Sequence, residues 1–381
     1  MDDSIKSIFS SLTSKATNFF GGEDGDFVVG VDIGSSAIKV VELKKKKGKA
    51  MLETYGAISL GPYVQGGEIG QVTNLPAEKI VEALREVLKA SEASSNSSAM
   101  AIPVQSSLVF GLSLPARLTE SEMKSVVPTE SRKYIPVPIN EVSLDYFVLP
   151  TKEPSFVEAN NPNVVSGDEI KKDILVVAIQ NDAVSKYRSI SSQCDLKSSF
   201  FELEIFSSIR SNFEHELSLV LLIDLGASKT KLSLVEFGTV KAYHTINRGG
   251  ADMTDSISKS LSIPFAKAEE YKKEFGLLEN PSEKSIPEII KTHLDYIFSE
   301  ANTVLLNYEK KYNQTISKVI LTGGGASMKG LAEIAMGNFK TEVSIGKPFS
   351  KVGSPAFLEK VLLATGPEFA VALGLALRKL Q

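Results

Sequence analysis

The chain has 381 residues, of which 43% are apolar and 23% charged, and its formal net charge is −4. This is the composition of a globular protein, and at roughly 150 residues per domain the length predicts two or three domains. A slightly acidic chain argues against DNA or RNA as the main partner, because phosphate binding usually needs a basic domain. The single cysteine, Cys194, excludes an internal disulfide, and the three separated histidines disfavour a structural zinc site.

The first twenty residues predict a short amphipathic helix. Apolar residues from Ile5 to Phe20 recur at helical spacing, and the pattern stops at Gly21 and Gly22. Two interpretations stay open: the helix docks on its own domain or is partly disordered, or it binds a membrane surface or a partner. Because the N-terminus lacks a secretory signal and the longest apolar runs are strand-sized, we expect a soluble, cytoplasmic protein without a membrane span.

The next segment predicts three strands and a helix. Residues 27–33 and 38–43 are apolar runs separated by a small polar turn, and 51–60 forms a third strand. Residues 76–92 carry apolar positions on one face, as expected of a helix packed on a sheet. The lysines at 44–47 fit the solvated tip of a hairpin, with an interaction patch as the alternative.

An internal repeat organises most of the chain. Residues 31–39, VDIGSSAIK, align with residues 223–231, IDLGASKTK, at an offset of 192 positions, so Asp, Gly, Ser and Lys recur in register. The surroundings of the second copy repeat as well and predict two similar α/β halves. The elements expected there are strands at 219–225, 231–237 and 240–248, a helix at 251–262 and a buried strand at 318–322.

A segment between the halves breaks the repeat. Its predicted elements follow the order strand, helix, strand, strand, and residues 152–169 read as an exposed loop. A helix at 182–194 either completes this insert or returns the chain to the first half. The four predicted elements are residues 108–114, 119–134 with Pro128 inside, 142–149 and 174–179.

The repeated loops have the composition of a phosphate-binding site. Gly34 and Gly226 let the backbone approach a phosphate closely, and the hydroxyl groups of Ser35, Ser36 and Ser228 can donate hydrogen bonds. Each loop is followed by a strand, whereas a Rossmann fingerprint or a P-loop leads into a helix. The pair of loops therefore predicts a phosphate clamp of another type.

Charged residues of the repeat extend this prediction. Asp32 and Asp224 would hold a hydrated Mg²⁺ between the loops, because Mg²⁺ keeps several waters and takes one or two carboxylates. Lys39 could compensate phosphate charge directly. A third glycine-rich segment, Thr322–Ala326, follows a buried strand, and its glycines would let a flat base and a ribose lie against the backbone.

These motifs resemble the actin/Hsp70/sugar-kinase superfamily, in which two phosphate loops and an adenosine loop close around ATP. The resemblance covers residues 27–377 and implies an α/β, actin/Hsp70-like (RNase H-like) fold with duplicated βββαβαβα halves. The final helix, Gly366–Leu377, would link the halves. The residues that the resemblance assigns to ATP are Asp32, Gly34, Ser35, Ser36, Lys39, Asp224, Gly226, Ala227, Ser228, Thr230, Gly249, Gly250, Glu269, Lys272, Gly323, Gly324, Gly325 and Ala326, with Glu269 and Lys272 at the ribose and adenine edge and Asp32 and Asp224 at Mg²⁺.

Within the superfamily, the insert looks like the SHS2 (1C-type) subdomain shared by FtsA and PilM proteins, and the PilM family is the better match. The chain stops at Gln381, where FtsA would continue into a linker and a membrane-binding helix. The resemblance implies a cytoplasmic ATP-binding adaptor of the type IV pilus inner-membrane platform, peripheral to that membrane through its partners. It would bind the N-terminal cytoplasmic peptide of PilN between the first half and the insert, with self-association left open, and nucleotide would set the angle between the halves.

One departure from the family pattern concerns the second loop. The family usually has Thr-Thr-Asn near its end, whereas this chain has Lys229-Thr230-Lys231, which places an extra positive charge near the phosphates. Hydrolysis needs a group that positions water. Glu204, at the head of the connecting helix, is the candidate catalytic residue, and Gln180 is a second one. Enzymatic activity is left open, at most a slow ATPase.

The expected division of the chain has six parts, and three other functions remain as alternatives. These are an FtsA-like filament-forming division protein, a small-molecule kinase of the same superfamily, and a scaffold that binds no nucleotide. The six parts are an N-terminal helix and linker (1–26), the first half of domain 1 (27–104), the SHS2-type insert (105–190), a connecting helix region (191–218), domain 2 (219–365) and a C-terminal helix returning to domain 1 (366–381).

Overall fold

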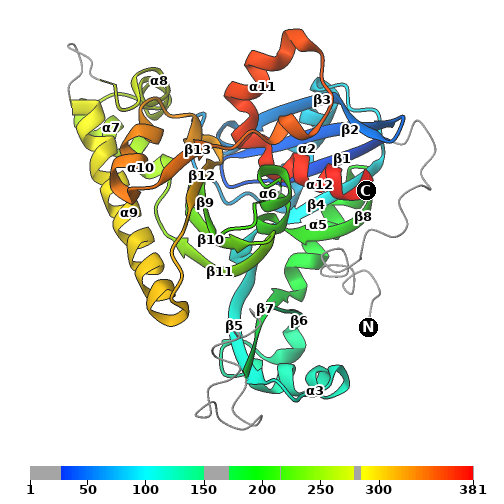
Figure 1. Ribbon diagram of the computed structural model, residues 1–381. Coiled ribbons are helices and arrows are strands. Elements are labelled where there is room, and N and C mark those ends of the chain that lie inside the picture. The colour runs from blue at the N-terminus through cyan, green and yellow to red at the C-terminus, as the bar shows by residue number, and fades with distance from the viewer. Residues whose placement is uncertain (1–26, 150–170, 215, 279–284, 381) are drawn as a thin grey trace.

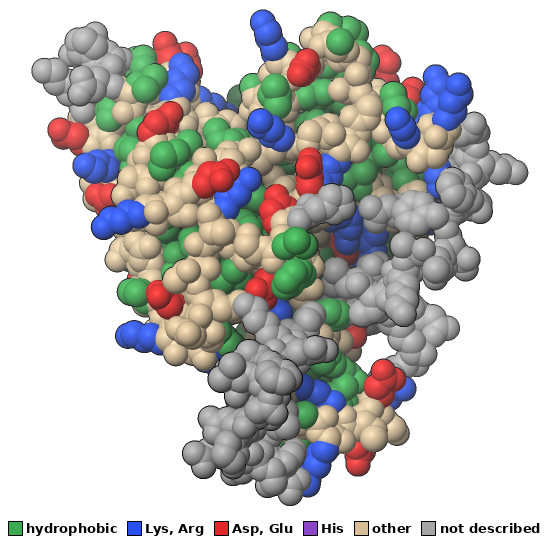
Figure 2. Space-filling view, in the orientation of Figure 1, with side chains coloured by type: hydrophobic (Ala, Val, Ile, Leu, Met, Phe, Trp, Pro, Cys, Tyr) green, Lys and Arg blue, Asp and Glu red, His purple; other side chains and the backbone are tan. Residues whose placement is uncertain are grey.

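The computed structural model describes residues 27–149, 171–214, 216–278 and 285–380 (Figure 1). The amphipathic helix expected in the first twenty residues and the loop expected at 152–169 lie outside the described residues. Figure 2 shows acidic and basic side chains interspersed over one face of the molecule.

The first half is built on a five-stranded sheet in the order β3-β2-β1-β4-β8. The first three strands are antiparallel neighbours, whereas β4 and β8 join parallel to β1. The long apolar run of β1 is buried because helices cover both faces of the sheet. The strands are β1 (Phe27–Ile33), β2 (Ala37–Lys46), β3 (Lys49–Ser59), β4 (Ser97–Ile102) and β8 (Lys197–Leu203).

The second half repeats this plan, with the order β11-β10-β9-β12-β13 and the same change from antiparallel to parallel pairing. Asp32 pairs with Lys39 across β1 and β2, and Asp224 pairs with Lys231 across β9 and β10. The structure thus confirms the repeat at the level of individual residue pairs. The strands are β9 (Val220–Leu225), β10 (Thr230–Glu236), β11 (Thr239–Ile246), β12 (Lys318–Thr322) and β13 (Glu342–Ile345).

The insert forms a third sheet with its own small core. Its antiparallel strands have the order β5-β7-β6, and one helix packs against them, so the predicted succession of strand, helix, strand, strand is confirmed. The helix begins with a capping box between Thr119 and Glu122 and contains Pro128. Figure 1 shows the insert projecting below the two larger sheets. Its elements are β5 (Ser107–Pro115), α3 (Glu120–Ser131), β6 (Val142–Val148) and β7 (Lys171–Gln180).

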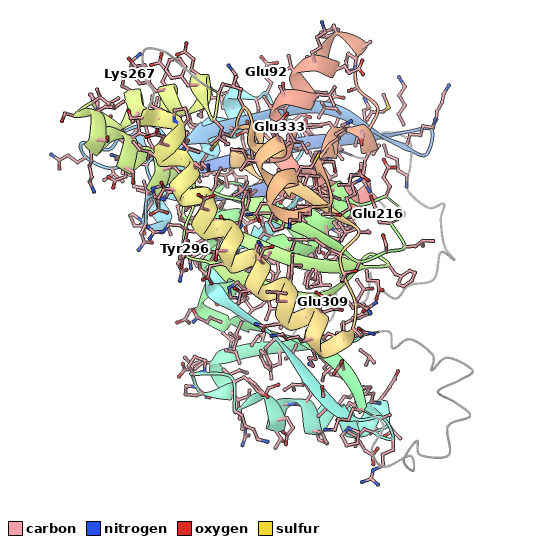
Figure 3. All side chains as sticks on the ribbon, turned by 60° about the vertical axis from the view of Figure 1, so that its left-hand side comes forward. Glu92, Glu216, Lys267, Tyr296, Glu309 and Glu333 are labelled. Carbon is pink, nitrogen blue, oxygen red and sulfur yellow. The ribbon has the colours of Figure 1, made fainter. Side chains whose placement is uncertain are left out.

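Helices cover both large sheets. In the second half, α9 (Ser285–Tyr312) lies along the outer side, and its buried face includes Leu294 and Phe298. Tyr296 and Glu309 mark the course of this helix in Figure 3. The other helices of the two halves are α2 (Ala77–Ala90), α5 (Asn181–Gln193), α6 (Glu204–Asn212), α7 (Gly250–Leu261), α8 (Phe265–Phe275), α10 (Leu331–Phe339), α11 (Glu359–Thr365) and α12 (Ala370–Leu380).

Helix α5 resolves an alternative that the sequence left open. Tyr187 and Ile190 lie in the same apolar cluster as β1 and α2, so the chain returns to the first half at this helix. Three strands escaped the sequence analysis: β4, β13, and β8, which precedes α6 within the region expected to hold only a connecting helix.

One helical stretch has the length and hydropathy of a membrane span. Among the described residues, this stretch is Ala356–Leu380. Core helices of soluble proteins can have the same length and hydropathy. Of the most apolar window of this stretch, 67% is buried inside the protein. The sequence predicted a linking helix over part of this stretch, Gly366–Leu377, and no membrane span. The structure shows why it is apolar: α12 packs between β1 and α6, where every residue from Ala370 to Leu377 is buried.

Candidate functional site

A cleft of about 910 Å³ lies between the two halves, and both repeated loops face it. Most of the predicted site residues come together here from elements far apart in the chain. Those that line the cleft are Asp32, Gly34, Ser35, Ser36, Lys39, Glu204, Asp224, Gly226, Ala227, Ser228, Gly250, Glu269, Lys272, Gly323, Gly324 and Gly325.

The two loops fold into the same turn. The N–H of Gly34 donates to the carbonyl of Ala37 at 3.0 Å, and the N–H of Gly226 donates to the carbonyl of Lys229, also at 3.0 Å. Each turn directly follows a strand that starts with a buried apolar run, so two rigid sheets hold the loops. The result is a pair of matching hairpin turns in the wall of one cleft.

Asp32 is a buried carboxyl group in this wall. Burial raises its pKa to about 6, with the nearby Lys39 opposing the rise and Glu204 adding to it. The carboxyl is therefore less acidic than an ordinary aspartate.

Lys231 joins two acidic residues on the other side of the cleft. Its Nζ lies 2.6 Å from Oε2 of Glu204 and 3.3 Å from Oδ2 of Asp224. Burial lowers the pKa of Lys231, but the attraction of the two carboxylates outweighs burial and holds the pKa well above its usual value. The remaining oxygen of Glu204, Oε1, accepts a hydrogen bond from the N–H of Val104 at 3.0 Å.

The glycine-rich loop packs directly on the second copy of the repeated loop. Gly323 has φ of +83°, a conformation that favours glycine, and its N–H donates to the carbonyl of Pro367 at 2.9 Å. A Cβ at this position would overlap Oδ1 of Asp224. Gly324 differs, because the nearest atom to a Cβ there is the Cβ of Glu368 at 3.9 Å.

Glu269 and Lys272 on α8 form a closed polar cluster. Nζ of Lys272 donates to the carbonyl of Gly250, to Oγ1 of Thr254 and to Oε2 of Glu269, at 2.8, 2.7 and 2.6 Å. Burial raises the pKa of Glu269, but Lys272 and Thr254 outweigh burial and hold it below its usual value. These side chains and the carbonyl of Gly250 thus join α7 to α8.

A contact beside this cluster joins the halves across the mouth of the cleft. The N–H of Ala266, at the start of α8, donates to Oε2 of Glu68 at 2.8 Å. Glu68 belongs to the loop that follows β3 in the first half. The sequence analysis missed it because no local pattern marks an acceptor for a helix start 198 residues away.

Three predicted residues lie behind the cleft rather than in its wall. Thr230 is fully buried, and its Oγ1 donates to the carbonyl of Arg248. Gly249 precedes α7 and packs on Ala227, where a Cβ would overlap the carbonyl oxygen. Ala326 belongs to the apolar core of the second half. These three residues support the loops from behind the wall of the cleft, because each one contacts other parts of the second half and not the cleft.

Other residues of the wall carried no signal in the sequence. Lys186 and Tyr187 reach the cleft from α5, and Glu368 reaches it from the turn before α12. Lys229 and Lys231 also line the cleft and had been singled out as a departure in the second loop. Gln180, the second catalytic candidate, is not among the residues that line the cleft.

Asp224, one of the two predicted magnesium ligands, already has a cationic partner. Oδ2 of Asp224 faces Lys231, and Oδ1 packs against Gly323. Within the part of the chain that the structure describes, no three His, Cys, Asp or Glu residues form a group that could hold a metal. Mg²⁺ keeps several waters and takes one or two carboxylates, so the ion pair with Lys231 would compete with direct coordination by Asp224.

Two halves of the same topology around a cleft with paired hairpin loops define an actin-like fold, as predicted. The family described as "Type IV pilus assembly protein PilM" matches residues 30–380. The chain therefore belongs to the PilM family.

Solved structures and curated relatives agree with this fold. A chain of the "PilM-PilN type IV pilus biogenesis complex" is similar with a TM-score of 0.76 and 24% identity, covering 93% of this chain and 98% of that one. The ethanolamine utilization protein EutJ from Carboxydothermus hydrogenoformans is similar with a TM-score of 0.53 and 15% identity, covering 99% and 97%. The cell division protein FtsA of Escherichia coli K12 is 23% identical over 248 residues, so the chain spans 57% of that relative's length and 56% of its own.

Proposed function

We propose that this chain binds ATP in the cleft and acts as an actin-like adaptor of the type IV pilus inner-membrane platform. One observation carries the nucleotide proposal: two loops related by the internal repeat and the glycine-rich loop at Gly323 surround one cleft. Membership of the PilM family supports the role in pilus assembly.

The cleft supplies complementary groups for the parts of ATP. The hairpin turns at Gly34 and Gly226 offer glycine backbone and serine hydroxyl groups to the phosphates, and Lys39 adds a positive charge. The open space above Gly324 suits a flat base. We expect Glu269 and Lys272 to stand at the ribose and adenine edge, where their mutual ion pair fixes their positions.

Hydrolysis is proposed to be slow at most. Glu204 is the group that would position water, but both of its oxygens already accept hydrogen bonds, one from Lys231 and one from Val104. A carboxylate engaged in this way is a weak base, because its lone pairs are occupied and its charge is neutralised.

A substitution in the glycine-rich loop tests nucleotide binding. We expect Gly324→Leu to lower the affinity for a fluorescent ATP analogue at least about tenfold, because this glycine lines the cleft and a Cβ there is in ordinary contact only with the Cβ of Glu368, at 3.9 Å. Gly337→Leu is the matched control, since a Cβ at this glycine of α10 meets nothing within 4 Å and the residue lies outside the cleft. Equal affinity of the two variants, each with a normal melting curve, would contradict the proposal.

The proposed partner is the N-terminal cytoplasmic peptide of PilN, which would hold the protein at the inner membrane from the cytoplasmic side. Support comes from the family and from the likeness to a chain of the PilM-PilN complex. The insert has its own apolar core, so it offers a preformed surface for a peptide. We expect saturable fluorescence anisotropy with the labelled peptide and none with a scrambled peptide, and absence of binding with and without ATP would remove this role.

An FtsA-like filament is the second candidate, and the similarity to FtsA favours it. This function requires self-association. Sedimentation of the protein in the presence of ATP distinguishes the two, because a filament pellets whereas an adaptor stays in the supernatant.

A further inference from the structure

We propose that Lys231 takes the place of the divalent cation, so that the cleft binds the phosphates of ATP without requiring Mg²⁺. This inference rests on the proposed nucleotide binding and assigns a task to Lys231 within that site. It starts from Asp224, a predicted magnesium ligand whose carboxylate is paired with Lys231 in this structure.

The ammonium group of Lys231 lies between the carboxylates of Glu204 and Asp224. Nζ of Lys231 is 2.6 Å from Oε2 of Glu204 and 3.3 Å from Oδ2 of Asp224. The side chains of Lys231, Glu204 and Asp224 are 13%, 9% and 13% exposed. Carboxylates so shielded from water need a positive charge beside them. A fixed lysine supplies that charge as part of the chain.

The other oxygens of the two carboxylates are engaged too. Oε1 of Glu204 accepts the N–H of Val104 at 3.0 Å, and Oδ1 of Asp224 packs against Gly323. Direct coordination of a metal ion by Oε2 of Glu204 or Oδ2 of Asp224 would therefore compete with Lys231. Lys231 belongs to strand β10 and not to a free loop. Its side chain could therefore move away from the two carboxylates only if the buried wall of the cleft changed.

The internal repeat shows that this task is specific to the second half. Lys39 holds the position in β2 that Lys231 holds in β10, each opposite the aspartate of its own loop. Yet Lys39 makes no ion pair or hydrogen bond through its ammonium group with any described residue, although it lines the same cleft. Lys39 is thus available to an incoming phosphate, whereas Lys231 neutralises the acidic residues that would otherwise repel it.

The experiment compares nucleotide affinity with and without divalent cations. A fluorescent ATP analogue is titrated into the full chain in excess EDTA and in excess MgCl₂, and the ratio of the two dissociation constants is the readout. For the wild type we expect a ratio within about threefold. For Lys231→Met we expect binding at least about tenfold weaker in EDTA than in MgCl₂, because Asp224 and Glu204 then need another cation.

Two further variants keep the test decisive. Lys229→Met removes a lysine of the same loop that lines the cleft but pairs with no carboxylate among the described residues, so it should keep the wild-type ratio. Lys231→Arg retains the positive charge and should also keep the wild-type ratio of dissociation constants. A melting curve shows whether Lys231→Met folds. If it does not fold, the ratios of dissociation constants of the wild type and of Lys231→Arg test the proposal.

The outcomes separate this inference from the proposed function. Binding of the analogue by the wild type only in MgCl₂ would overturn the role of Lys231 while leaving ATP binding intact. The same ratio in folded Lys231→Met as in the wild type would also overturn it and leave Lys231 as a structural ion pair. No binding by the wild type in either solution would instead contradict nucleotide binding itself.

Discussion

Replacing Gly374 with alanine is expected to destabilise the protein by about 3 kcal/mol, because the added methyl group would push α12 away from α6. A Cβ at Gly374 would overlap the carbonyl oxygen of Ser207 on α6 and lie 2.9 Å from its Cα. These are backbone atoms within a helix, so they cannot move aside as a flexible side chain does. The helices are packed face to face at the centre of the molecule (Figure 1).

The same substitution is expected to weaken ATP binding. Helix α6 leads from the first half into the second, and the turn before α12 touches the glycine-rich loop through Pro367 and Gly323. A displaced α12 would therefore move one wall of the cleft. Chemical denaturation measures the loss of stability, and titration with the fluorescent analogue measures the loss of affinity.

Gly337→Ala is the matched control for this prediction. Gly337 also lies within a helix, but a Cβ there meets nothing within 4 Å. Alanine should raise stability by about 0.5–1 kcal/mol, because glycine is the poorer helix former. Equal changes in the two variants would show that helix propensity, rather than the close approach of α6 and α12, decides the outcome.

The sequence was sufficient to predict the duplicated architecture, because the repeat fixes both loops and the apolar alternation fixes the strands beside them. It was not sufficient for β8. This strand starts with Lys197 and contains Glu202, and charged residues at these positions read as a solvated segment. Only the fold reveals that Glu202 is fully buried, since its partners come from other elements.

Prediction of the candidate site from the sequence has the same limit. Aspartates and glycines of the loops could be placed by pattern, because a turn is a local structure. The partner of Lys231 could not, since Glu204 lies 27 residues earlier in the chain and meets it only after the two halves assemble. The magnesium prediction did not include the contacts of Lys231 with Asp224 and Glu204, because local sequence carries no information about the meeting of distant segments.

Glu202→Ala is expected to cost about 3–5 kcal/mol, because it leaves two arginines buried without their partner. The carboxylate of Glu202 accepts two hydrogen bonds from Arg210, at 2.7 and 2.8 Å, one from Arg378 at 2.7 Å and one from Ser207 at 2.6 Å. Arg210 also donates to the carbonyl of Gly374. One carboxylate thus ties β8, α6 and α12 together.

The pH dependence of stability follows from the same contacts. Burial raises the pKa of Glu202, but Arg210 and Arg378 outweigh burial and hold it below its usual value. A carboxyl group whose folded pKa is lowered stabilises the protein above its unfolded pKa of about 4.3, and this stabilisation is lost as the pH falls through the folded pKa. The difference in unfolding free energy between the wild type and Glu202→Gln should therefore be largest near neutral pH and shrink in acid.

Denaturant titrations at several pH values measure this difference. Glu82→Ala, which breaks an exposed pair with Lys79 on α2, is the control and should change stability by less than about 1 kcal/mol, since both partners are about half exposed and well screened. A pH-independent difference for Glu202→Gln would mean that the shape of the side chain, and not its charge, holds α6 and α12 to the first sheet.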